Sequence, residues 1–237
     1  MKNRYRPFQR FWTTDAGLTG VLVFLILFLV SAYLLDQYYI AKVFSLIFIS
    51  LFFLSGVLLV YQRPLERLIF GALALGSLGF IWIDFFYPEF GLRTARTLAT
   101  MATVVYLIVL LLRHVFSQGA VTYHRICGAI AIYLLVIFLW SDLYLFILEI
   151  NPKALTLPPG FPTLPPEAMS GQFDSLHGTM IYFSVITITT LGYGDILPIS
   201  PAARLAVMLQ ALFGQLYPSV MLAWLVSMEI LTRTRKG

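Results

Sequence analysis

The stretch Thr-Ile-Thr-Thr-Leu-Gly-Tyr-Gly-Asp, residues 187–195, decides how this chain is organised. It overlaps the end of a moderately apolar segment, 174–190, that is too short to cross a bilayer and return. Glycine at alternate positions, 192 and 194, allows backbone conformations that other residues avoid. We therefore expect a short re-entrant helix, with Asp174 as its N-cap, followed by an extended loop.

Long apolar segments lie on both sides of this stretch. About twenty apolar residues are needed for a helix to cross the hydrocarbon core. A proline-rich stretch, 151–172, separates the fifth long segment from the re-entrant helix, which suits a stiff loop outside the membrane. We interpret the first segment as a retained span, because it is too long for a signal peptide and lacks a small-residue cleavage site. The six predicted spans are 17–35, 41–61, 67–87, 97–117, 123–149 and 201–231.

The composition agrees with a multi-pass membrane protein. Of the 237 residues, 59% are hydrophobic and 11% are charged, whereas a soluble domain has about a quarter charged residues. The one cysteine, Cys127, and three scattered histidines have no metal-ligand spacing. The sequence has no glycine-rich phosphate loop and no recognisable catalytic set. We therefore expect neither enzyme activity nor a cofactor.

The basic residues predict the orientation. If the N-terminus is cytoplasmic, the inner segments carry more Lys and Arg than the outer ones, as the positive-inside rule requires. The net charge of +5 is then a topology signal, so we expect no nucleic-acid partner. We expect both termini in the cytoplasm and the protein in the plasma (cell inner) membrane. The inner residues are Lys2, Arg4, Arg6, Arg10, Arg63, Arg67, Arg113, Arg125, Arg233, Arg235 and Lys236; the outer ones are Lys42, Arg93, Arg96, Lys153 and Arg204.

Residues 187–195 resemble the selectivity filter of potassium channels, whose common form is Thr-Val-Gly-Tyr-Gly. Leu191 stands in place of the valine, which is a conservative departure. In such a filter, backbone carbonyl oxygens replace the water around a potassium ion. The resemblance implies that the carbonyls of Thr190, Leu191, Gly192 and Tyr193, with the Thr190 hydroxyl, bind K⁺, and that Gly194 completes the filter.

The resemblance also implies roles for the residues around the filter. Tyr193 would point away from the ion and pack on the aromatic pair Tyr182 and Phe183. Asp195 would place a carboxylate at the outer mouth, where it concentrates cations. Ile186 stands where many potassium channels have a glutamate, so a glutamate–aspartate pair behind the filter is not available.

The sixth span carries the candidate gate. Gly214 lies twenty residues after Gly194, where the inner helix of potassium channels often has a hinge glycine. Pro218 cannot donate to the Gly214 carbonyl, so the helix should bend there, either as a static kink or as a working hinge. On the same alignment Gln215, Leu222 and Val226 should face the cavity or the inner mouth. Hydrophobic side chains there could close the pore by dewetting.

One loop per chain supplies only a quarter of a ring, so we expect a homotetramer. The fold class is then all-α: six transmembrane helices, a re-entrant pore helix and a selectivity filter. The resemblance covers Tyr123 to Ser227 firmly and the earlier spans only by their number. We divide the chain into a basic cytoplasmic N-terminus at 1–16, a four-helix peripheral domain at 17–117 and a pore domain at 118–237.

The four spans before the pore domain resemble those of voltage-gated potassium channels in number but not in their basic residues. A voltage sensor needs several basic residues at every third position; here only Arg93 and Arg96 fit, and 97–112 is uncharged. We favour interface anchors that snorkel over a weak sensor paired with Asp84 or Glu89. Two outer acids of the fifth span, Asp142 and Glu149, are expected to be hydrated. Voltage dependence should be weak or absent.

The sequence therefore favours a channel that conducts K⁺ passively across the membrane, with K⁺ as its permeant ligand and membrane lipid around it. Two alternatives stay open: a voltage-gated potassium channel with a reduced sensor at Arg93 and Arg96, and a non-conducting channel subunit. An uptake carrier would usually hold four degenerate loops in one chain, and Tyr193 argues against a nonselective pore. The stimulus that opens the pore is left open between voltage, pH, lipid, tension and constitutive leak.

Overall fold

The computed structural model describes residues 16–34, 39–59, 64–87, 90–116, 122–157 and 173–234. Over these residues the chain is almost entirely helical, which confirms the predicted class. The only strands among them are two short ones of two residues each. The elements are α2 (Ala16–Leu34), α3 (Tyr39–Leu59), α4 (Pro64–Phe86), α5 (Phe90–Val115), α6 (Tyr123–Ile150), β1 (Leu155–Thr156), α7 (Phe173–Ile188), β2 (Leu197–Pro198) and α8 (Pro201–Thr234).

Four of the described helices are long and apolar enough to cross a membrane: α4, α5, α6 and α8. Helices α2 and α3 have 19 and 21 residues. Their described apolar parts, Gly17–Ser31 and Val43–Leu58, are shorter than the other four. Local signals agree with several boundaries: Pro64 begins α4, where its missing N–H costs nothing, and the Thr122 side chain caps α6 by accepting from the Arg125 amide.

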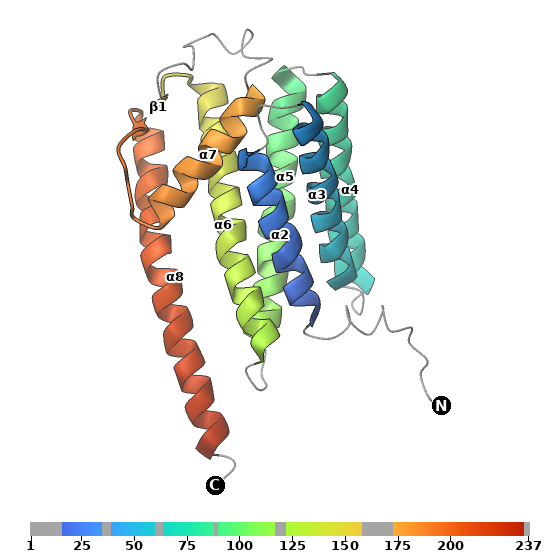
Figure 1. Ribbon diagram of the computed structural model, residues 1–237, viewed down its shortest axis with the longest axis vertical. Coiled ribbons are helices and arrows are strands. Elements are labelled where there is room, and N and C mark those ends of the chain that lie inside the picture. The colour runs from blue at the N-terminus through green and yellow to red at the C-terminus, as the bar shows by residue number, and fades with distance from the viewer. Residues whose placement is uncertain are drawn as a thin grey trace.

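The long helices stand side by side, and α7 lies across them (Figure 1). Helices α2 to α5 form one side of the molecule and α8 forms the opposite edge, with α6 between them. Helix α7 crosses α6 obliquely toward α8, and the chain then returns to the end from which α7 started. The predicted short helix after the fifth span is thus present and begins at Phe173, while the predicted N-cap side chain, Asp174, lies outside the described side chains.

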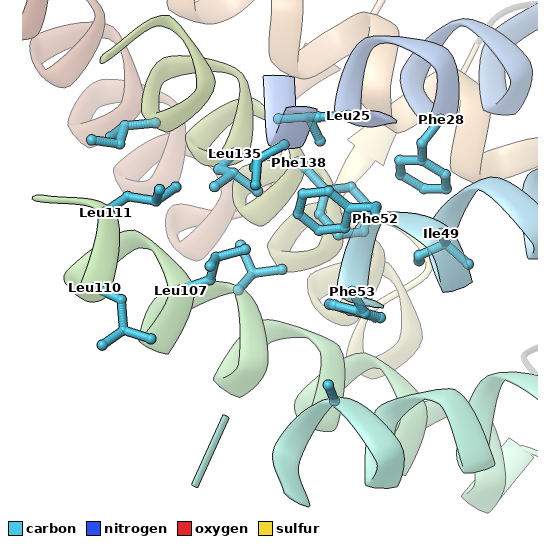
Figure 2. Packing of buried hydrophobic residues seen from close by; sticks show 14 of the residues in the cluster. Leu25, Phe28, Ile49, Phe52, Phe53, Leu107, Leu110, Leu111, Leu135 and Phe138 are labelled. Atoms are coloured by element: carbon cyan, nitrogen blue, oxygen red, sulfur yellow. The ribbon is translucent and has the colours of Figure 1, made fainter. Parts of the chain in front are cut away.

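The larger core joins α6 to the peripheral helices. Phe28 on α2 and Phe138 on α6 meet edge to face, with ring centroids 5.2 Å apart. Because lipid tails are as apolar as leucine, close packing rather than removal from water stabilises such a contact between membrane helices. Figure 2 shows the neighbouring buried side chains, which include Leu25, Phe52, Phe53, Leu107, Leu111 and Leu135.

A second core lies among α6, α7 and α8. Beside it, β1 and β2 pair antiparallel, Leu155 opposite Pro198 and Thr156 opposite Leu197. The Leu197 amide donates to the Thr156 hydroxyl at 2.9 Å. This small sheet was not predicted, because two residues are too few to show an alternating pattern. It joins the segment after α6 to the segment before α8, at the end of the molecule where the loop after α7 returns.

Candidate functional site

The loop after α7 has an alternating backbone conformation. Positive φ angles occur at Thr190 (58°), Gly192 (51°) and Gly194 (81°), that is, at every second residue. Both glycines thus take the left-handed conformation that their missing Cβ permits. Thr190 is β-branched, and a left-handed conformation is a genuine outlier for such a residue. Strain of this kind persists where the surrounding structure demands it, which is often at a functional site.

The main chain of α7 holds this loop. The amides of Leu191 and Gly192 both donate to the Ile186 carbonyl, at 2.9 and 3.1 Å, and the Thr190 amide donates to the Thr187 carbonyl at 3.0 Å. Carbonyls at the end of a helix have no partner within the helix, so these bonds also satisfy them. Position 186 has no glutamate side chain, and the backbone carbonyl of Ile186 holds the loop instead.

Asp195 is fastened by the same helix. The Tyr182 hydroxyl donates to Asp195 Oδ2 at 2.7 Å, and the Ile196 amide donates to Asp195 Oδ1 at 3.1 Å. Both carboxylate oxygens therefore have a donor, and the charge is held beside the loop. Tyr182 supports the loop as predicted, but through a hydrogen bond to Asp195 and not through a ring contact with Tyr193.

Within one chain, Tyr193 does not pack on Phe183, so the expected ring contact stays a prediction for the assembly. Phe183 is buried and meets Tyr144 of α6, with ring centroids 4.8 Å apart. Tyr193 is 68% exposed, and it makes no ring contact with the described residues. Phe183 follows the buried face of α7 toward α6, whereas Tyr193 lies beyond the end of that helix. Phe183 therefore positions α7, and Tyr193 is left available to a neighbour.

Gly214 has a packing role that the sequence did not reveal. Helix α8 runs without interruption through Gly214 and Pro218. A Cβ added at Gly214 would lie 2.0 Å from the Ile188 carbonyl oxygen, far inside contact distance. The glycine is thus required where α8 meets the end of α7, whether or not α8 bends there.

One side chain near that contact reaches the loop. Gln215 Nε2 donates to the Thr190 hydroxyl at 3.2 Å, and that hydroxyl donates to the Thr189 carbonyl at 2.7 Å. Gln215 therefore contacts the start of the loop; its expected place at the cavity stays a prediction. Leu222 and Val226 are exposed further along α8.

Helix α8 presents a broad exposed apolar surface. Its buried residues form one narrow stripe at helical spacing, Ala203, Ala206, Gln210, Gly214 and Met221. The rest of its described surface is largely exposed and apolar, on a helix that stands at the edge of the molecule (Figure 1). We name this surface the α8 face; it contains Leu205, Met208, Leu209, Leu212, Leu216, Val220, Leu222 and Val226.

The first two arginines of α5, Arg93 and Arg96, are paired and do not snorkel. Arg96 Nη1 donates to Asp84 on α4, and Arg93 Nε lies 3.9 Å from the same carboxylate. Arg93 is only 4% exposed. The prediction of interface anchors is therefore wrong. The predicted span at 97–117 began too late: α5 begins at Phe90, and the additional turns bring both arginines opposite the end of α4.

Asp142 and Glu149 are also buried, which corrects the expectation that water surrounds them. The Thr100 hydroxyl donates to Asp142 at 3.0 Å and the Thr94 hydroxyl donates to Glu149 at 3.1 Å. These bonds join α5 to α6. A signal was present in the sequence, because threonine recurs at every third position from 94 to 103 and so forms a polar stripe on a helix.

Among the described residues, no group of three or more His, Cys, Asp or Glu side chains could hold a metal ion. The oxygens available to a cation near the loop are those of the main chain, the Thr190 hydroxyl and the Asp195 carboxylate. Such hard oxygen donors suit an alkali or alkaline-earth cation better than a transition metal.

A comparison with known protein families gives a match over this part of the chain. Residues 132–229 match the family model described as "Ion channel". The matched segment begins in α6, includes α7 and its loop, and ends in α8, so this part of the chain is similar to an ion-channel domain. The four peripheral helices lie outside the match. No curated protein and no solved structure matches the chain.

Proposed function

We propose that this chain is a subunit of a potassium-selective channel and that four copies surround one ion path. The observation that carries the proposal is the alternating backbone of the loop: Thr190, Gly192 and Gly194 are left-handed within a Thr-Leu-Gly-Tyr-Gly sequence. A segment in which left-handed residues alternate with others can turn successive carbonyls to one side. Four such segments around an axis would surround a dehydrated ion with oxygens.

The surroundings of the loop support cation conduction. The C-terminal end of α7, which carries partial negative charge, leads directly into the loop and would favour a cation there. Asp195 adds one carboxylate per subunit beside the loop, held by Tyr182. At the other end the Thr190 hydroxyl is fixed by Gln215. Ions would move down their electrochemical gradient, with no chemical reaction.

The exposed surfaces support a fourfold assembly of identical chains. Leu191 and Tyr193 in the loop are 56% and 68% exposed in a single chain. Non-helical backbone at membrane depth is tolerated only where it is buried in protein or lines a water-filled cavity. Neighbouring copies would cover the loop and part of the α8 face and would give Tyr193 its aromatic or apolar neighbours. With one loop per chain, a closed ring needs four chains.

In this proposal the chain crosses the membrane six times, with α2 and α3 added to the four longer helices. Both termini lie in the cytoplasm of a multi-pass plasma-membrane protein. The loop at 187–195 then faces the outside, as the basic residues of the inner segments require.

Voltage dependence is proposed to be weak or absent. Moving one charge across the whole membrane yields about 2.3 kcal/mol per 100 mV. Among the described residues of α5, only Arg93, Arg96 and Arg113 are basic apart from His114. Near the outer end, Arg93 is buried and Arg96 is partly buried. The ion pair between Arg96 and Asp84 favours the alternative, a potassium channel with a reduced sensor. Steep conductance–voltage curves with gating currents would support that alternative.

The experiment is current recording from the purified protein in lipid bilayers. With potassium on one side and sodium on the other, we expect the reversal potential to follow the potassium gradient. Cross-linking should give complexes of four chains. Equal sodium and potassium permeability would overturn the proposal, and so would an assembly without fourfold stoichiometry. A well-assembled tetramer without current would favour the non-conducting subunit.

A further inference from the structure

A closed chain of hydrogen bonds lies between α6, α7 and α8. The Tyr144 hydroxyl donates to Gln210 Oε1. Gln210 Nε2 donates to the Ser184 hydroxyl at 2.7 Å and to the Ser184 carbonyl at 3.0 Å. The Ser184 hydroxyl in turn donates to the Ile137 carbonyl at 2.7 Å. Tyr144, Ser184 and Gln210 are each fully buried.

Every side-chain polar group in this hydrogen-bonded network has a partner. A glutamine amide carries two N–H donors and one carbonyl acceptor, and Gln210 uses all three. Leaving a buried polar group without a partner costs more than a typical hydrogen bond contributes, so a fully satisfied network defines one arrangement of its helices. Gln210 is the centre, because it is the only member that contacts both α6 and α7 through its side chain.

The next turn of α8 repeats the contact. Gly214 lies four residues after Gln210, and it abuts the carbonyl of Ile188, which lies four residues after Ser184. Two successive turns of α8 thus meet two successive turns of α7, first through hydrogen bonds and then through direct backbone packing. This part of α8 cannot shift along α7 without breaking buried hydrogen bonds.

The position of α7 determines the position of the loop, because the loop is hydrogen-bonded to the main chain of α7. Ile186 lies between Ser184 and Ile188, and its carbonyl accepts from the amides of Leu191 and Gly192. A rotation of α7 that Gln210 no longer prevents would therefore move the carbonyls of residues 190–193 relative to the axis. Because ion selection depends on the number and position of these oxygens, small displacements should weaken it.

We infer that Gln210 is a positioning residue of the ion path: its side chain locks α7 and thereby sets the carbonyl geometry of residues 190–193. The inference rests on the proposed function and identifies a residue that controls its selectivity from outside the loop. Gln210 does not touch the loop, since its described partners are Tyr144 and Ser184.

The test compares ion permeability in three proteins. Gln210→Leu replaces glutamine with an apolar side chain of similar size that lacks the amide. We expect the sodium-to-potassium permeability ratio of this variant to rise about tenfold. In the triple variant Tyr144→Phe, Ser184→Ala, Gln210→Leu, the groups left without partners are also removed. Its thermal stability should recover, because an all-apolar contact can be nearly neutral, but its permeability ratio should stay raised.

The matched control is Ser77→Ala. Ser77 and Thr103 form a fully buried hydroxyl pair at 2.7 Å between α4 and α5, away from the loop. This variant should lose stability and keep the wild-type permeability ratio. If Gln210→Leu does not assemble, the triple variant carries the test.

The outcomes separate the two claims. A wild-type protein that passes sodium as readily as potassium defeats the proposed function and the inference together. A selective wild type defeats the inference alone if the assembled Gln210→Leu or triple variant keeps the wild-type ratio. Recovery of selectivity together with stability in the triple variant would show a purely structural role and would also overturn it.

Discussion

Two buried polar networks fasten α6 to its neighbours, and they differ in charge. On the side of α7 and α8 the groups are neutral: two hydroxyls, one amide and two backbone carbonyls, with every side-chain donor engaged. On the side of α4 and α5 the groups are ionic, with Asp84, Asp142 and Glu149 facing Arg93, Arg96 and two threonines. The two sides of one helix are thus held by different interactions.

The difference has physical consequences. A saturated neutral network admits one geometry and suits a scaffold that must not move. The ionic network has three carboxylates for two guanidinium groups, and Glu149 Oε1 is buried with no hydrogen-bond partner among the described residues. Buried ion pairs lose stability heavily when one partner is removed, yet replacing the whole pair by neutral groups is often tolerated. We therefore expect that altering the ionic side has little effect on ion selectivity in the proposed channel, whereas altering the neutral side changes it.

The largest effect should come from removing one partner of the ion pair between Arg96 and Asp84. Arg96→Gln leaves Asp84 buried opposite Arg93 alone, and we expect the free energy of unfolding in detergent micelles to fall by about 3 kcal/mol. The double variant Arg96→Gln, Asp84→Asn should recover most of this loss. The permeability ratio should not change in either protein. An altered ratio in the stable double variant would contradict the proposed separation of the two networks.

Gly214→Ala should have the next largest effect. The new methyl group would overlap the Ile188 carbonyl, and relieving the overlap should cost about 2 kcal/mol and reduce the yield of assembled complex. Gly76→Ala on α4 is the control, because a Cβ there meets nothing within 4 Å. Alanine also favours the helix over glycine, so the control should be as stable as wild type or more stable. An unaffected Gly214→Ala protein would refute the close approach of α7 and α8.

The smallest effect should come from the hydrogen bond between Thr100 and Asp142, where the loss of the donor is compared with the loss of the charge. Thr100→Val removes the hydroxyl that Asp142 accepts from, and we expect a loss of about 1.5 kcal/mol because the carboxylate stays buried. Asp142→Asn keeps an acceptor for Thr100 and removes the charge, so it should lose less than Thr100→Val. Chemical unfolding of both variants in micelles measures the order. The reverse order would mean that the charge of Asp142 itself stabilises the contact.

Much of the pore domain could be predicted because its signals are local. The pattern of residues 187–195 predicts an extended loop after a short helix, and Gly192 and Gly194 predict where the backbone is left-handed. The structure has both features. Apolar length predicted six spans, and four of the described helices are long and apolar enough to cross a membrane. Ion binding by this loop, the fourfold assembly and the gate stay predictions.

The errors have a common cause. Arg93, Asp142 and Glu149 looked like surface groups because each lies near the end of an apolar run. Their partners come from other helices: Asp142 and Thr100 are 42 positions apart, and Glu149 and Thr94 are 55 apart. Gln210 was missed for the same reason, although a glutamine in an apolar helix is itself a sign that a buried partner exists.

The sequence alone determined the membrane environment, the helical class and the alternating loop, because hydropathy and the conformational freedom of glycine act over a few consecutive residues. Only the tertiary structure decided which polar side chains meet. The glycine that sequence similarity suggests as a hinge is also a contact between α7 and α8, and Tyr182 holds Asp195 where a ring contact was expected. Such pairings depend on how helices pack, and packing is set by the shapes of surfaces that are far apart along the chain.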